Sequence, residues 1–154
     1  MHKRKLSALI ILIFLFGNPQ IGKAQRLTDS SVNKIEMILS AFGVESDGFP
    51  NIQATIDLKK DTSICNVSYY DPKFKDTSYR LDKKDIDYIK SLLNKYDVKR
   101  LQRNYTVSKT DQPTSITIFY LSDEKIEIKD YGLVEELPLK RLYDLVYKLD
   151  INYR

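Results

Sequence analysis

Two aspartates, Asp111 and Asp130, and two tyrosines, Tyr105 and Tyr131, are the residues of this chain best suited to acid–base chemistry. The aspartates flank a segment with the alternation of a hairpin. Paired carboxyls can carry out hydrolysis when their surroundings drive their pKa values apart, so that one acts as acid and the other as base. A structural interpretation is simpler, because Asp111 precedes a Gln-Pro turn and Asp130 ends a strand. The sequence favours structure and keeps a small carboxylate-dependent hydrolase as an alternative.

Other catalytic arrangements find little support. The single histidine, His2, lies in a leader that we expect to be removed, which excludes a Ser-His-Asp triad and histidine metal ligands. The spacing Ser-x-x-Lys occurs at Ser31–Lys34 and Ser122–Lys125, without the other motifs of acyl-transfer enzymes. The few glycines form no phosphate-binding loop. We therefore predict no catalytic, cofactor-binding or metal-binding residues, no cofactor, and a chain that is not an enzyme.

Tyrosine is the unusual feature of the composition, with 11 tyrosines and no tryptophan. Tyrosine combines a large apolar ring with a polar tip, which suits hydrated protein interfaces. The alternative is that these rings only cover the edge of the core. The candidate protein-binding residues, which lie beside the expected core stripes, are Tyr70, Tyr79, Tyr143 and Tyr147, with Tyr153 near the end of the chain.

Residues 1–24 have the pattern of a signal peptide. A basic start is followed by an apolar run from Leu6 to Phe16, and small residues precede an expected cleavage between Ala24 and Gln25. The run is shorter than the roughly 20 apolar residues that a membrane-spanning helix needs. We expect a periplasmic or secreted protein with no membrane span after cleavage.

Removal of the leader changes the charge of the chain. Four basic residues are lost, so the 25 Lys and Arg fall to 21, equal to the 21 Asp and Glu. A balanced chain lacks the cationic excess that binding to nucleic acid requires. Cys65 is the single cysteine, so no disulfide can form within the chain. Apolar and polar residues alternate around Cys65, which favours a buried thiol over a reactive or intermolecularly paired one.

The patterns of the body of the chain predict one domain. We expect a flexible lead-in over residues 25–34 and a single domain over residues 35–154. Residues 32–42 fit either a helix face or a strand, and periodicity alone leaves both open. Alternation then predicts one hairpin from Ile52 to Tyr70 and a second from Ser115 to Tyr131.

Two helices are expected, one after each hairpin. Asp82 and Asp85 are placed to cap the first helix, whose apolar stripe runs from Ile86 to Tyr96. Pro138 suits the first turn of the second helix, whose expected stripe is Leu139, Leu142, Leu145/Val146 and Leu149. The order hairpin-helix-hairpin-helix predicts an α+β fold: a mostly antiparallel sheet of four to five strands with two helices packed on one face.

Several short motifs resemble an uncharacterised secreted bacterial family that is known only as a domain of unknown function. They are Tyr105, the run from Thr110 to Thr114, the run from Ile128 to Gly132, and, upstream, Ala41-Phe42-Gly43 and Phe49-Pro50. The resemblance spans roughly residues 35–150 and implies a strand around Ile35 to Ala41. Many members carry cysteines where this chain has Ala41 or Phe42, and Phe49, so no role of those cysteines transfers. The resemblance implies no activity.

Three functional hypotheses follow. The first is an exported, non-catalytic module that binds another envelope or secreted protein, of the inhibitor or immunity type. The second is a structural envelope component without a discrete ligand. The third is the hydrolase that would use Asp111 and Asp130. The missing catalytic residues place the binding module first.

Overall fold

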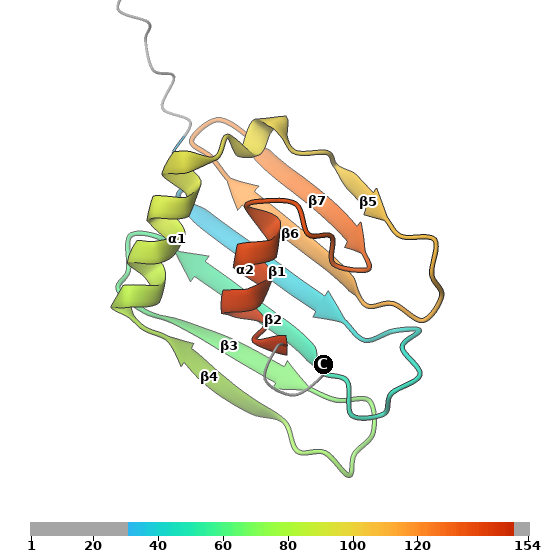
Figure 1. Cartoon of the computed structure of the whole chain (residues 1–154). Helices are drawn as coiled ribbons and strands as arrows, with labels where there is room; N and C mark the ends of the chain where they lie inside the picture. The colour runs from blue at the N-terminus through green and yellow to red at the C-terminus, as the bar shows by residue number, and fades with distance from the viewer. Residues whose placement is uncertain (1–30, 150–154) are drawn as a thin grey trace, which may run out of the picture.

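The computed structural model describes residues 31–149, which form one sheet and two α-helices (Figure 1). The expected signal peptide and Tyr153 lie outside the described residues. The elements are, in chain order, β1 (Lys34–Ser40), β2 (Asn51–Asp57), β3 (Ser63–Ser68), β4 (Thr77–Leu81), α1 (Lys83–Lys95), the 3-10 turn η1 (Val98–Arg100), β5 (Asn104–Thr106), β6 (Thr114–Tyr120), β7 (Lys125–Tyr131) and α2 (Leu139–Val146).

The sheet places the first strand in its middle. Its order is β4-β3-β2-β1-β6-β7-β5, so β1 lies between the two hairpins that the sequence predicts. Every pairing is antiparallel except that of β5 with β7. A strand over residues 34–40 agrees with the resemblance and decides between the two alternatives for this region. It also begins within the expected lead-in, because Lys34 already pairs with Asp57 and Tyr120.

The α+β class and the mostly antiparallel sheet are confirmed, but the expected strand number and element order are wrong. The described chain has seven strands, with four before α1 and three between α1 and α2. The two additional edge strands are β4 and β5. β4 is exposed along most of its length and β5 has only three residues, so neither gives an alternation long enough to predict a strand.

Both helices lie in front of one face of the sheet (Figure 1). Asp82 caps α1 as expected, since its side chain accepts from the Asp85 N–H while the Asp85 carboxylate accepts from the Asp82 N–H. The core lies between sheet and helices, and its fully buried side chains include Ile35, Ile56 and Ile128. We call the opposite side of the sheet the open face. No helix in residues 31–149 is long and apolar enough to cross a membrane.

The strand β6 is oriented against its own hydrophobic pattern. Its buried side chains are Ser115, Thr117 and Phe119, while Ile116 and Ile118 lie on the open face and are only half-buried. Two polar residues therefore face the core and two isoleucines face outward. Local patterns of this kind are broken mainly where another interaction compensates or where function requires it.

Candidate functional site

Asp130, one of the two candidate acids, is fully buried beneath α2. Both of its carboxylate oxygens accept from the Val134 N–H, at 3.0 and 3.2 Å, and one accepts from the Tyr143 hydroxyl at 2.9 Å. Burial raises the pKa of the Asp130 carboxyl above its ordinary value, while these hydrogen bonds act against the rise. The carboxyl thus holds the segment after β7 against α2, which supports the structural interpretation.

A second polar contact beneath α2 involves the buried side of β6. The hydroxyls of Ser115 and Tyr147 lie 2.7 Å apart, and Thr117 lies 3.5 Å from Ser115. The ring of Tyr147 stacks on that of Tyr143, with centroids 5.4 Å apart. Tyr147, the residue directly after α2, thereby satisfies the Ser115 hydroxyl that β6 turns inward.

The buried face of α2 differs from the expected leucine stripe. Tyr143 and Tyr147 are buried with Leu139, Leu142 and Val146, whereas Leu145 is only partly buried. Tyr143 and Tyr147 therefore cannot serve as contact residues on the surface. The two tyrosines are buried because their hydroxyls form hydrogen bonds with Asp130 and Ser115. Leucine side chains could not make these bonds.

The other candidate residues are dispersed. Asp111 is exposed in the loop before β6 and accepts from the Thr110 hydroxyl at 2.8 Å. The Tyr131 hydroxyl accepts from the Gln112 N–H, and the buried Tyr105 hydroxyl accepts from the Gln102 N–H. The hydrogen bonds of the described residues do not connect Asp111 with Asp130. The structure places these acids in two different environments.

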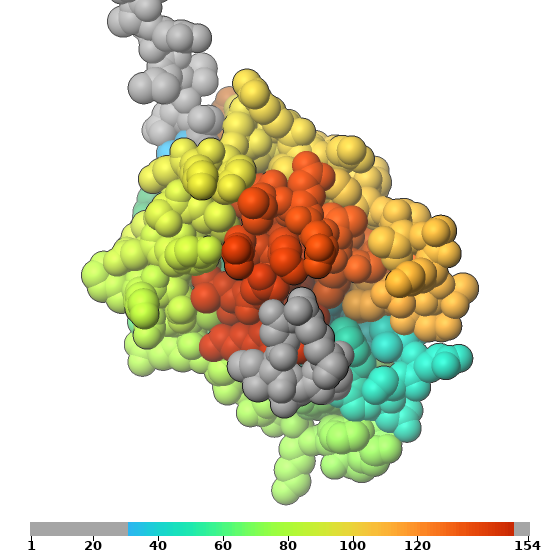
Figure 2. All heavy atoms as spheres, in the orientation of Figure 1, coloured from blue at the N-terminus to red at the C-terminus, as the bar shows by residue number. Residues whose placement is uncertain are grey.

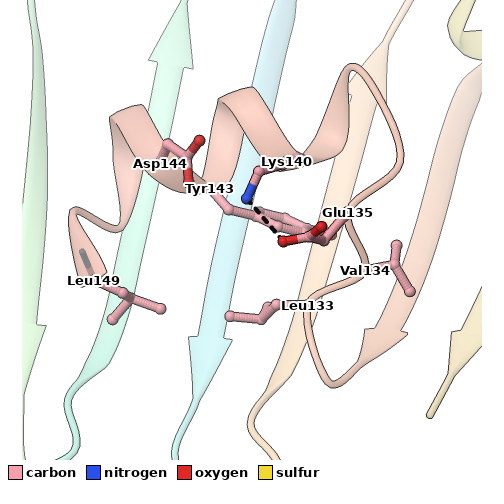
Figure 3. Close-up of a pocket in the computed structure, with 7 residues that line it drawn as sticks. All are labelled: Leu133, Val134, Glu135, Lys140, Tyr143, Asp144 and Leu149. Atoms are coloured by element: carbon pink, nitrogen blue, oxygen red, sulfur yellow. Dashed lines mark hydrogen bonds and ion pairs between the residues drawn. The ribbon is translucent and has the colours of Figure 1, made fainter. Parts of the chain in front are cut away.

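A small pocket lies over Tyr143, between α2 and the segment that precedes it (Figure 3). Its volume is about 130 Å³, below the roughly 300 Å³ at which pockets for small ligands begin. Lys140 closes one side by pairing with Glu135 at 3.2 Å. The remaining lining residues are Leu133, Val134, Asp144 and Leu149. Within residues 31–149, no group of three or more His, Cys, Asp or Glu is placed to hold a metal ion.

Two neighbouring loops at one end of the sheet carry exposed aromatic side chains. The β1–β2 loop (residues 41–50) carries Phe42, whose side chain is 80% exposed, and the β3–β4 loop (residues 69–76) carries Tyr70 at 64% and Phe74 at 37%. We call Phe42, Tyr70 and Phe74 the aromatic loop end. The two loops are neighbours, the cyan one at the lower right of the molecule and the green one below it (Figure 2).

One ion pair joins the two loops, and a second lies within the β3–β4 loop. The Lys73 ammonium lies 2.7 Å from the Asp71 carboxylate and 3.3 Å from that of Asp47 in the other loop. The hydrogen bond to Lys73 lowers the pKa of Asp71. The rings of Tyr69 and Phe74 pack with centroids 5.3 Å apart. These contacts give the loops a defined shape although their tips are exposed.

The backbone around Phe42 is similarly anchored. The Phe42 N–H donates to the Ser40 hydroxyl at 3.2 Å, and the neighbouring Ala41 N–H donates to the Asn51 side chain at 2.9 Å. Gly43 follows with φ 86°, a conformation that favours glycine and turns the chain back. The phenylalanine ring is therefore held outward by ordered backbone on both sides.

Of the four predicted contact tyrosines within residues 31–149, only Tyr70 belongs to the aromatic loop end. Tyr70 is exposed as a contact residue must be, whereas Tyr79 is half-buried and donates its hydroxyl to the Val146 carbonyl. Phe42 and Phe74 were not among the candidate contact residues, because Phe42 also fits the apolar face of the alternative helix over residues 32–42. The signal available was the position of Phe42 directly before a glycine at the end of an apolar segment.

Cys65, in the middle of β3, has no exposed surface. Burial raises the pKa of its thiol to about 11. The preference for a buried thiol is therefore confirmed, and a disulfide between two folded chains would require β3 to open.

The fold and the surface define a small α+β domain with one helix-covered sheet face and an exposed aromatic loop end. The family model described as Domain of unknown function (DUF6438) matches residues 48–150, and the chain belongs to this family. The resemblance to a domain-of-unknown-function family is thus confirmed, while secretion and bacterial origin stay predictions. No curated protein and no solved structure matches the chain.

Proposed function

We propose that this protein is an exported, non-catalytic binding module of the inhibitor or immunity type, and that the aromatic loop end is its contact surface. The exposure of Phe42 on an anchored backbone carries the proposal. An aromatic ring left in water is unfavourable for a monomer, and aromatic anchors that enter a pocket supply much of the energy of protein interfaces.

The shape of the loop end favours a concave partner. Two loops joined by the Asp47–Lys73 ion pair carry the exposed rings of Phe42, Tyr70 and Phe74 at one end of the sheet. Pre-ordered loops lose little conformational entropy on binding, which leaves more of the contact energy for affinity. We infer that the partner is another exported protein with an apolar cleft. The leader over residues 1–24 supports meeting this partner outside the cytoplasm.

A site-specific photo-crosslinker tests this in cells that produce the protein naturally. Placed at Tyr70, it should give one discrete adduct, which mass spectrometry of the crosslinked protein identifies. The same group at Lys84, which is exposed on α1, is the control position. No adduct from Tyr70, or the same adducts from both positions, would contradict the proposal.

Binding to the captured partner then tests the anchors. Phe42→Ser and Tyr70→Ser should each weaken binding by tenfold or more, since truncating an interface anchor costs about 2 kcal/mol or more. Because both rings are largely exposed, the unfolding of the purified variants should match that of the wild type. Lys84→Ser is the matched control and should bind normally.

A further inference from the structure

The open face carries an apolar patch that the loop end does not use. Ile38 of β1 lies directly opposite Ile116 of β6, and Ile118 is two residues further along β6 on the same face. Ile38 is 37% exposed, and both β6 isoleucines retain exposure although they lie in central strands. We call these three residues the isoleucine patch. Adjacent apolar side chains on a sheet face, unlike singly scattered ones, are candidates for an interaction surface.

An ordered polar cluster borders the patch. The Glu36 carboxylate accepts from the Lys34 ammonium at 2.8 Å and from the Tyr120 hydroxyl at 2.6 Å. The ammonium also lies 3.8 Å from the centre of the Tyr120 ring. The charge of Glu36 is therefore already compensated on its own chain, and its side chain is held in place.

The strand register arranges the open face in two neighbouring rows. One row runs through Glu127, Ile118, Glu36 and Thr55, and the other runs through Lys129, Ile116, Ile38 and Gln53. On β7 the rows therefore carry opposite charges, on β6 both carry isoleucine, and on β2 both carry neutral polar residues. If the first row of one copy is placed against the second row of another copy, glutamate faces lysine and isoleucine faces isoleucine.

We propose that the isoleucine patch binds a second copy of this chain, so that two open faces pack about a twofold axis that lies between the rows and across the strands. Each Glu127 then meets Lys129 of the second copy, and each Ile118 meets Ile116 of the second copy. Two sheets pack face to face at a separation of about 10 Å, which such side chains fill.

The charge pattern is the reason for choosing a second copy over a different protein. In a twofold interface every contact occurs twice, so a surface without self-complementarity would place like charges together. Here the axis pairs Glu127 with Lys129 twice and brings Ile38 beside the compensated Glu36. The loop end stays outside this contact, so the inference goes beyond the proposed function and does not depend on it.

Charge reversal on β7 tests the geometry. The protein is produced from the full chain and its mass is followed over a range of concentrations by sedimentation equilibrium. The wild type should reach the mass of a dimer. Glu127→Lys alone, or Lys129→Glu alone, creates two like-charge contacts and should weaken dimerisation by about tenfold or more. The double variant Glu127→Lys/Lys129→Glu should restore it.

Two further variants separate the possible outcomes. Ile118→Thr should weaken dimerisation while the monomer stays folded, and Lys84→Glu, on the helix side, should leave dimerisation unchanged. A wild type that stays a monomer at millimolar concentration overturns the inference. A dimer whose affinity is unchanged by Glu127→Lys and by Lys129→Glu also overturns it. So does a failure of the double variant Glu127→Lys/Lys129→Glu to restore dimerisation. The adducts of the crosslinker at Tyr70 are a separate result, so either proposal can fail alone.

Discussion

The hydroxyls of Ser115 and Tyr147 lie 2.7 Å apart in the core, between the middle of the sheet and the end of α2. This contact explains how β6 can turn two polar side chains inward. A buried hydroxyl without a partner is costly, whereas one that meets another hydroxyl is not. With Ser115 and Thr117 satisfied on the inner side, the alternation of the strand leaves Ile116 and Ile118 on the open face.

Removing this hydrogen bond should destabilise the fold in a coupled manner. Tyr147→Phe and Ser115→Ala should each lower the free energy of unfolding by about 1 to 2 kcal/mol, because each leaves a buried hydroxyl with a lost partner. The double variant should lose less than the sum, by roughly 0.5 kcal/mol or more. Urea unfolding of the four proteins measures the coupling. Additive losses would show that the two hydroxyls act independently.

The two sides of the β6–β7 hairpin should respond differently to the same substitution. Ile118→Thr, on the open face, should cost under about 1 kcal/mol, since threonine suits a half-exposed strand position. Ile128→Thr should cost about 2 kcal/mol or more, because Ile128 is fully buried and the new hydroxyl would lose water. Urea unfolding at a concentration where the protein is monomeric provides the comparison. Equal costs would contradict the outward orientation of Ile118.

The raised pKa of Asp130 should make part of the stability depend on pH. Since burial raises the folded-state pKa above 3.8, the folded protein holds this proton more tightly than the unfolded chain does. Its contribution to stability is therefore greatest below pH 3.8 and is lost as pH rises through the folded pKa. Asp130→Asn removes this dependence, so the stability of the wild type relative to Asp130→Asn should fall as pH rises from 3 to 7.

The alanine variant is the matched control for Asp130. Asp130→Ala leaves the Val134 N–H and the Tyr143 hydroxyl without their acceptor and should cost about 2 kcal/mol or more at neutral pH. Asp130→Asn retains an acceptor and should cost less. A wild-type stability that rises relative to Asp130→Asn between pH 3 and 7 would show that the carboxylate form is the favoured one.

The thiol of Cys65 should be unreactive in the folded protein. It has no exposed surface, and its pKa of about 11 leaves little thiolate at pH 7.5. A thiol-specific reagent should modify it negligibly over hours in native buffer and completely in denaturant. Rapid native labelling would indicate that the edge of the sheet near β3 and β4 opens readily.

The leader should be absent from the protein that cells accumulate outside the cytoplasm. We expect mass spectrometry of the native product to show an N-terminus at Gln25, after cleavage behind Ala24. An intact Met1 terminus would remove the support for export, and with it the inference that the partner is an exported protein.

Local sequence patterns were sufficient for much of the fold. The alternation in β2 and β3 and the Asp82–Asp85 cap of α1 are short-range signals, and each corresponds to the observed element. The apolar residues of 32–42 fit both the period of a helix and the alternation of a strand. The resemblance to a family implied the strand that the structure has. The edge strand β4 carries too little buried surface to leave a pattern.

The tertiary structure alone decided which side of β6, and which residues along α2, face inward. Alternation indicates that β6 has two unlike sides, but the polar side is the buried one, where Ser115 meets Tyr147 at the end of α2. The same contacts bury Tyr143 and Tyr147, which the sequence offered as surface residues, whereas Phe42 and Tyr70 lie exposed in loops. The sequence by itself determined the class of fold and most of its elements, because these depend on neighbours along the chain. Partners that are distant in the sequence determined the orientation of β6 and of the segment around α2, and with it the isoleucine patch on the open face.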